Sequence, residues 1–78
     1  MTVGDWYRRF GPSSEDYFEL VHATDGVFTF RHYHFNRLTG HVGPPSEHRL
    51  TEKEWLDLRV ENEIVEISKS AVPFLMPL

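Results

Sequence analysis

The sequence predicts one α+β domain, spanning residues 1–78, in which a small antiparallel β-sheet packs against a single C-terminal helix. Three observations predict it. Two runs rich in aromatic and β-branched residues flank a turn, a second glycine turn precedes a short return strand, and a helix-start motif lies near Glu52. A chain of 78 residues buries only a small core, so we expect a partner subunit or another group to cover part of its apolar surface.

The N-terminal residues 6–10 leave two local structures open. Asp5 can cap a one-turn helix, which Gly11 would end and Pro12 would stop. The same residues can instead form a short edge strand. In either case residues 12–15 form a loop.

The clearest predicted element is a β-hairpin over residues 17–35. Residues 17–23 and 27–35 are rich in aromatic and β-branched side chains, and residues 24–26, with the sequence Thr-Asp-Gly, separate them. The turn sequence allows two registers, and the choice decides which side chains share a face of the sheet.

In the first register a two-residue type I′ turn pairs Thr24 with Val27. In the second, a three-residue loop pairs Ala23 with Val27 and places Glu19 opposite Arg31. We favour the second, because it sets opposite charges across from each other. It also places Tyr17 opposite Tyr33, Val21 opposite Thr29, and the apolar side chains of Phe18, Leu20, Phe28 and Phe30 on one face.

A third strand is expected after the next turn. Residues 36–40 form that turn, with Gly40 free to adopt a positive φ. Residues 41–42 then return as a short third strand. Residues 43–45, Gly-Pro-Pro, end the pairing because proline has no ladder donor, and residues 46–50 form an extended connector.

The capping box over residues 51–54 predicts a helix that begins near Glu52. Its end is open: the helix either continues to Ser68, or stops near Asn62 and residues 64–67 form a strand. We favour the longer helix, which would need cover on two sides. Its two apolar stripes would be Leu56, Val60, Ile64 and Ile67, and Trp55, Leu58 and Val65.

The C-terminal residues 71–78 are apolar and interrupted by prolines. Phe74, Leu75 and Met76 either fold back to complete the core or remain exposed, and exposed apolar patches usually mark interfaces.

Composition and charge narrow the classes of function. The net charge of −4 argues against general nucleic-acid binding and suits a basic protein partner. No apolar run reaches the length of a membrane span, and the first residues lack the features of a signal peptide. Cysteine is absent, which excludes disulfides and thiolate chemistry. We therefore expect a cytoplasmic protein that does not bind membranes.

Two histidines form the strongest candidate metal site. His32 and His34 project from the same face of a strand, and His48 or Asp16 could supply a third ligand. Two histidines in a strand are a weak signal, since they also suit the polar margin of an apolar face. We expect no metal and no cofactor, and keep a histidine-based metal-binding domain as an alternative.

Motifs for catalysis are missing from the sequence. It contains no Gly-x-Ser-x-Gly elbow, no phosphate-binding glycine loop and no His-Glu-x-x-His motif. The adjacent Glu47 and His48 point to opposite faces of an extended segment. We expect no catalytic activity, and keep a small enzyme or enzyme subunit with a His/carboxylate pair as a second alternative.

These observations favour a small stand-alone protein-binding module, an adaptor or an inhibitor of a larger complex, that forms a homodimer. Aromatic residues and arginine are common interface anchors. The expected contact residues are Trp6, Arg8, Arg9, Trp55, Leu58, Phe74, Leu75 and Met76.

Overall fold

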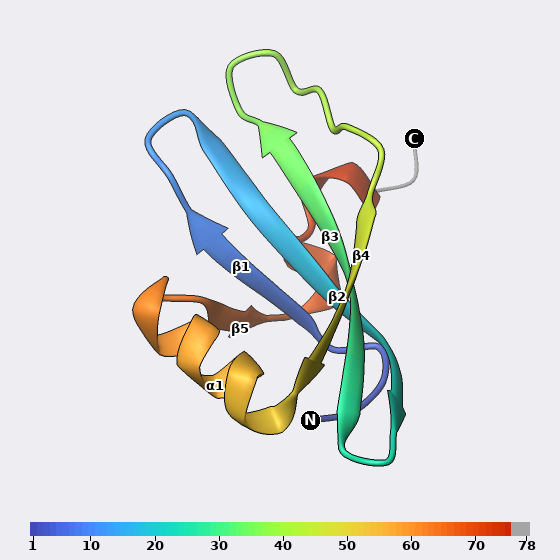
Figure 1. Ribbon diagram of the computed structural model, residues 1–78. Helices are drawn as coiled ribbons and strands as arrows, with labels where there is room; N and C mark the ends of the chain where they lie inside the picture. The colour runs from blue at the N-terminus through green and yellow to red at the C-terminus, as the bar shows by residue number, and fades with distance from the viewer. Residues whose placement is uncertain (76–78) are drawn as a thin grey trace.

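The computed structural model, which describes residues 1–75, confirms the α+β fold (Figure 1). Five antiparallel strands form one sheet in the order β4-β3-β2-β1-β5, and one helix packs on it. The elements are β1 (Trp6–Phe10), β2 (Ser14–Thr24), β3 (Val27–Asn36), β4 (Ser46–Thr51), α1 (Glu52–Glu61), β5 (Val65–Ile67) and two 3₁₀ turns, η1 (Lys69–Ala71) and η2 (Pro73–Leu75).

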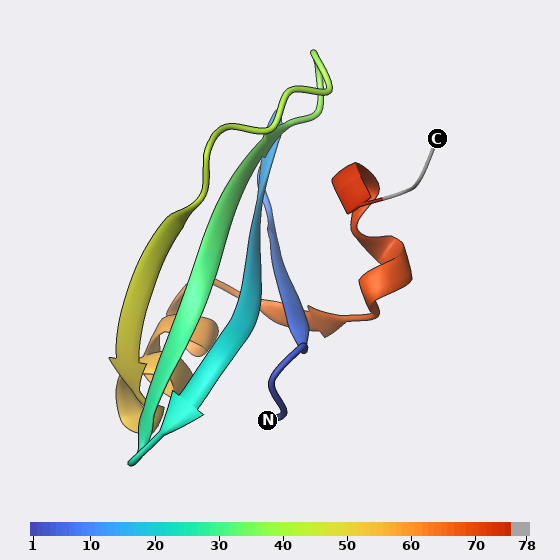
Figure 2. The ribbon, with the colours of Figure 1, turned by 90° about the vertical axis from the view of Figure 1, so that its right-hand side faces the viewer.

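Both faces of the sheet carry a cover from the same chain. Helix α1 lies on one face, and η1 and η2 lie on the other, as the side view shows (Figure 2). The alternating side chains of the strands therefore supply two separate apolar clusters, one on each face.

Trp55 is the centre of the cluster on the helix face. It is fully buried and is the one buried residue of α1. Its ring stacks on Phe30 with 4.1 Å between centroids, and the ring of Tyr7 meets it edge-on at 5.0 Å. Aromatic packing of this kind lets a single large side chain supply most of the contact between a short helix and the sheet, and Leu58 adds to it.

Phe74 and Val72 close the opposite face. Val72 is fully buried. The ring of Phe74 lies 5.0 Å from Tyr33 and 5.3 Å from Tyr17, so η2 covers the aromatic residues of β2 and β3. The tail thus folds back onto its own core as far as Phe74. Leu75 stays partly exposed, and Met76 lies outside the described residues.

The hairpin combines the two registers expected for it. Asp25 and Gly26 both have positive φ, +53° and +74°, and form a two-residue turn that pairs Thr24 with Val27. The favoured pairing of Ala23 with Val27 is therefore wrong at the tip. An irregularity between Leu20 and His22 then shifts the ladder by one residue.

Beyond this bulge the favoured register holds. Glu19 faces Arg31 and Tyr17 faces Tyr33, while the predicted pair of Val21 and Thr29 is replaced by His22 with Thr29. The bulge matters because it places the side chains of Phe18, Leu20 and Phe30 on the helix face. A uniform ladder from the two-residue turn would have split them between faces.

The third strand lies further along the chain than expected. Val42 forms only an isolated bridge with Phe35, so the strand expected at residues 41–42 is wrong. The strand is β4, in the segment predicted as a connector, and it pairs with β3 over six residues. The polar sequence of β4 hid it, because five of its six residues are exposed.

Residues 6–10 form a strand and not a helix. β1 pairs with β2 on one side and with β5 on the other, so it lies inside the sheet and not at its edge as expected. Its partner on the outer side is β5, whose residues would have belonged to the longer helix.

Helix α1 begins as predicted and ends early. The Thr51 side chain accepts a hydrogen bond from the Glu54 amide, and the Glu54 carboxylate accepts one from the Thr51 amide. The helix stops at Glu61, so the favoured extension to Ser68 is wrong. Glu63 has a positive φ of 53°, which turns the chain so that Ile64 is buried and β5 can pair with β1.

Candidate functional site

A cleft opens on the helix face of the sheet, beside the C-terminal half of α1. Its volume is about 390 Å³, at the small end of the range for ligand pockets. Strands β1 to β4 form its floor, and the end of the helix with the segment after it forms one wall. The lining residues are Arg9, Asp16, Phe18, Phe30, His32, His48, Leu50, Leu58, Asn62 and Ile64.

Cross-strand pairing explains why polar and apolar residues separate along this floor. His32 lies between Phe18 of β2 and Ser46 of β4, and the next row toward the hairpin tip pairs Phe30 with His48. Phe18 and Phe30 lie near the helix in the buried cluster. The cleft therefore has apolar walls near α1 and a polar rim away from it.

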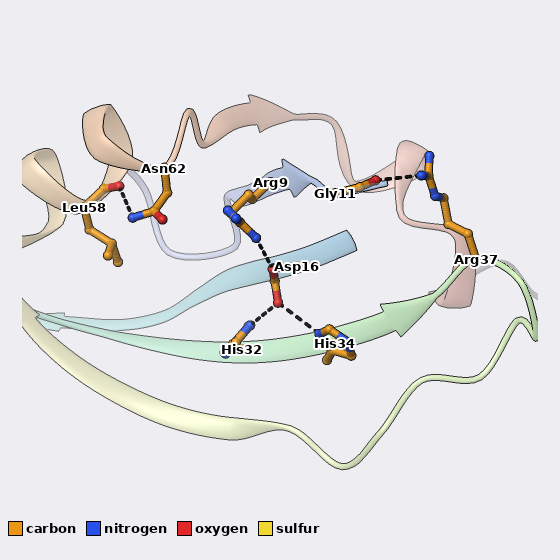
Figure 3. A network of polar contacts seen from close by, with 8 residues as sticks. All are labelled: Arg9, Gly11, Asp16, His32, His34, Arg37, Leu58 and Asn62. Carbon is orange, nitrogen blue, oxygen red and sulfur yellow. Dashed lines mark hydrogen bonds and ion pairs between the residues drawn. The ribbon is translucent and has the colours of Figure 1, made fainter. Parts of the chain in front are cut away.

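Asp16 is the centre of that rim (Figure 3). Its Oδ1 lies 2.8 Å from His32 Nε2 and 3.2 Å from His34 Nδ1, and its Oδ2 accepts a hydrogen bond from Arg9 Nη1 at 3.1 Å. Each imidazole nitrogen that faces an ionised carboxylate must carry a proton and donate it. Three side chains from β1 and β3 thus converge on one carboxylate of β2.

The same contacts control the charge of Asp16. Burial is the largest single influence and would raise its pKa. The hydrogen bonds from His32, His34 and Arg9 together outweigh burial and hold the pKa of Asp16 below its usual value. The carboxylate is therefore ionised at neutral pH and is already occupied by donors.

His32 is held on three sides. Its ring stacks on Phe18 at 4.6 Å between centroids with a 9° interplanar angle. It contacts Asp16 through Nε2, and the ring of His48 lies 5.5 Å away. His48 in turn contacts the Ser46 hydroxyl through Nε2 at 3.1 Å. These contacts fix the orientation of the imidazole inside the cleft.

The helix end contributes one oriented polar side chain. Asn62 Nδ2 donates to the carbonyl oxygen of Leu58 at 3.0 Å, which holds the amide at the cleft wall (Figure 3). Leu50 and Leu58 are only partly buried, and both pack against the helix-face cluster.

The structure separates the contact residues expected from the sequence. Trp6 and Trp55 are core residues, one in each cluster, and are not accessible on the surface of the chain. Arg8 lies on the face opposite the cleft, with its Nε 4.0 Å from a carboxylate oxygen of Glu15. Phe74 belongs to the second cluster, Leu75 is exposed, and Met76 lies outside the described residues.

Among the residues of that set that the structure describes, only Arg9 and Leu58 line the cleft. Asp16, His32 and His48, which the sequence offers as metal ligands, also line the cleft. The favoured register, with Tyr17 opposite Tyr33, implies that Asp16 faces His34, and this pairing is confirmed. Leu50 and Asn62 were not expected at any site. Leu50 could have been found only if residues 46–50 had been identified as a strand.

Residues 1–75 contain no group of three or more histidine, cysteine or acidic side chains arranged to hold a metal ion. His32 and His34 both direct a ring nitrogen at the same oxygen of Asp16.

Within the described part of the chain, no helix has both the length and the apolar character needed to cross a membrane. Comparison with protein-family models, with curated proteins and with solved structures gave no match.

Proposed function

We propose that this chain is a small protein-binding module, an adaptor or an inhibitor of a larger complex, with no chemistry of its own. The observation that carries the proposal is the cleft of about 390 Å³, whose apolar walls are left open by the described residues. An apolar side chain of a partner would enter beside Leu50 and Leu58, and the polar rim would hydrogen bond to the neighbouring backbone of the partner.

This proposal moves the contact surface away from the residues first expected to form it. Val72, Phe74 and the two tryptophans are used inside the chain, since Phe74 and Val72 cover one face of the sheet and Trp55 covers the other. Arg9 and Leu58 remain as expected contact residues, now joined by the other residues that line the cleft.

A capture experiment with matched variants tests the role of the cleft. The wild-type protein, Leu58→Lys and Leu38→Lys are immobilised and exposed to native cell lysate, and bound proteins are identified by mass spectrometry. Leu38 is 81% exposed in the turn after β3 and does not line the cleft, so its variant controls for added charge. We expect one partner to be retained by wild type and Leu38→Lys and lost by Leu58→Lys.

Leu58 also packs on the core, so its variant needs a check of folding by circular dichroism. Asn62→Ala, which removes a cleft side chain while leaving the core cluster intact, provides a second variant. Equal capture of the partner by all folded variants would contradict binding through the cleft.

We also propose that the protein acts in the cytoplasm and forms a homodimer. Cysteine is absent from the sequence, which suits a reducing compartment. Fractionation of native cells and sedimentation of the purified protein test the two parts separately.

A second candidate function is catalysis by the His32 and Asp16 pair. Their 2.8 Å contact lies in a cleft, and an imidazole oriented by a carboxylate is the usual arrangement of a general base. The reactive atom would be His32 Nδ1, because Nε2 faces Asp16.

A histidine comparison tests this candidate. His34 contacts the same carboxylate oxygen but does not line the cleft, so His34→Gln is the matched control for His32→Gln. A catalytic role predicts that turnover of a simple activated ester falls with His32→Gln and persists with His34→Gln. Absence of turnover in the wild type, or equal loss in both variants, would argue against it.

A further inference from the structure

Strand β4 forms an open edge of the sheet. It pairs with β3 on one side over six consecutive residues and has no neighbour on its other side among the described strands. Figure 2 shows it as the outermost strand, and α1 leads from its end back beneath the sheet, away from this edge (Figure 1). The opposite edge, β5, has only three residues.

Natural proteins usually protect such an edge. Short strands, bulges, proline and charged side chains all discourage pairing with other chains. β4 is six residues long, its ladder with β3 is regular and it contains no proline. Its remaining protection is charge, supplied by Glu47 and Arg49.

The two charges lie on one face of the sheet, two residues apart. Glu47 pairs with Arg31 and Arg49 with Thr29, on the face opposite the cleft, whereas the side chains of His48 and Leu50 line the cleft. One acidic and one basic residue flank His48. A second copy of the strand that runs in the opposite direction can therefore place its Arg49 opposite Glu47 and its Glu47 opposite Arg49.

We propose that two copies of this chain pair antiparallel along β4, in the register centred on His48, and form one continuous sheet. In a continuous antiparallel sheet, directly opposite residues point to the same face. When two identical strands pair symmetrically, one residue must therefore lie opposite its own copy, and the register is centred on that residue. Centring on Glu47 sets two glutamates opposite each other, and centring on Arg49 sets two arginines opposite each other. Centring on His48 pairs each Glu47 with Arg49 of the other copy.

Opposite charges in directly facing positions stabilise a sheet, and like charges destabilise it. The same charges therefore disfavour the registers centred on Glu47 and on Arg49 and favour the one centred on His48. The two-fold axis is perpendicular to the sheet, so both clefts open on the same side. The two His48 side chains lie next to each other at the axis. Because His48 lines the cleft, the second copy then borders the cleft on the β4 side.

This inference specifies the interface of the homodimer that the proposed function includes, and it is independent of binding in the cleft. Sedimentation equilibrium of the full chain tests it with three variants: Glu47→Arg, Arg49→Glu and the double exchange. Each single variant replaces two attractive pairs with two repulsive ones. We expect each to weaken dimerisation about tenfold or more.

The double exchange restores opposite charges and should restore dimerisation toward the wild-type value. Leu38→Lys, in the exposed turn after β3, should dimerise like the wild type. A monomeric wild type, a dimer unaffected by either single variant, or a double variant as weak as the single ones would overturn the inference. Capture of a partner in the cleft does not require the dimer, so each of these results would leave the proposed binding of a partner in the cleft standing. A monomeric wild type would also overturn the proposed homodimer, whereas the other two results would overturn only the register.

Discussion

The carboxylate of Asp16 and the imidazole of His32 lie 2.8 Å apart, joined across neighbouring strands on the helix face of the sheet. The contact gives the cleft a polar rim of defined orientation. His34 and Arg9 bind the same carboxylate, so a single side chain of β2 ties together three strands.

Removing the charge of Asp16 should lower stability. Asp16→Asn replaces an acceptor of three charged or polar donors with an amide that can satisfy fewer of them. We expect the free energy of unfolding to fall by about 1–2 kcal/mol, measured by urea denaturation. Asp57→Asn is the matched control. Asp57 forms only a surface ion pair with Lys53, so its variant should change stability by less than about 0.5 kcal/mol. Equal losses in the free energy of unfolding would show that the Asp16 network contributes no more to stability than a surface ion pair.

The network also predicts a dependence of stability on acid. The pKa of Asp16 is lowered in the folded chain, so its contribution is complete above its ordinary value of 3.8 and is lost as the pH falls through the folded value below that. Urea denaturation from pH 6 to pH 2.5 should show the difference between wild type and Asp16→Asn narrowing below about pH 4. A difference that stays constant over this range would contradict the assignment.

Phe74 and Leu75 are adjacent and should respond very differently to truncation. The ring of Phe74 contacts four aromatic residues of the sheet, while Leu75 is 39% exposed. Phe74→Ala should lower the free energy of unfolding by about 2–3 kcal/mol, below the full range for a buried ring because Phe74 is only partly buried. Leu75→Ala should cost about 0.5 kcal/mol or less. Similar melting temperatures for both variants would show that the tail does not belong to the core.

The hairpin turn gives a backbone test of the register. Asp25 has a φ of +53°, where a β-branched side chain is strained, whereas Thr24 lies in an extended strand. Asp25→Val should destabilise the protein by about 1–2 kcal/mol, and Thr24→Val should be nearly neutral. Thermal unfolding compares them. An equal effect of the two substitutions would contradict the two-residue turn.

Short-range sequence signals located some elements correctly, whereas contacts between distant residues decided others. The capping box at Thr51 located the helix start, because both of its hydrogen bonds lie within four residues. The alternation of residues 17–20 located the helix-face apolar residues. By contrast, nothing local to Val21 indicates the bulge. It reconciles a two-residue turn with burial of Phe18 and Leu20, and that burial depends on Trp55 from a distant helix.

The candidate cleft was only partly predictable for the same reason. His32, His34 and Asp16 could be placed on one face once the strand register near them was known. Leu50 and Asn62 join them only because β4 pairs with β3 and α1 ends at Glu61. The end of the helix depends on a distant partner, because residues 65–67 pair with β1 instead of continuing the helix.

The amino-acid sequence by itself determined the α+β class, the presence of the hairpin and the residue at which the helix begins. These depend on alternation, turn chemistry and capping, which act over a few residues. The tertiary structure alone decided the position of the third strand, the end of the helix, the use of Phe74 as a cover and the convergence of Arg9, His32 and His34 on Asp16. Each of these depends on which distant surfaces bury one another, and such long-range burial outweighs the weak local preferences of short segments.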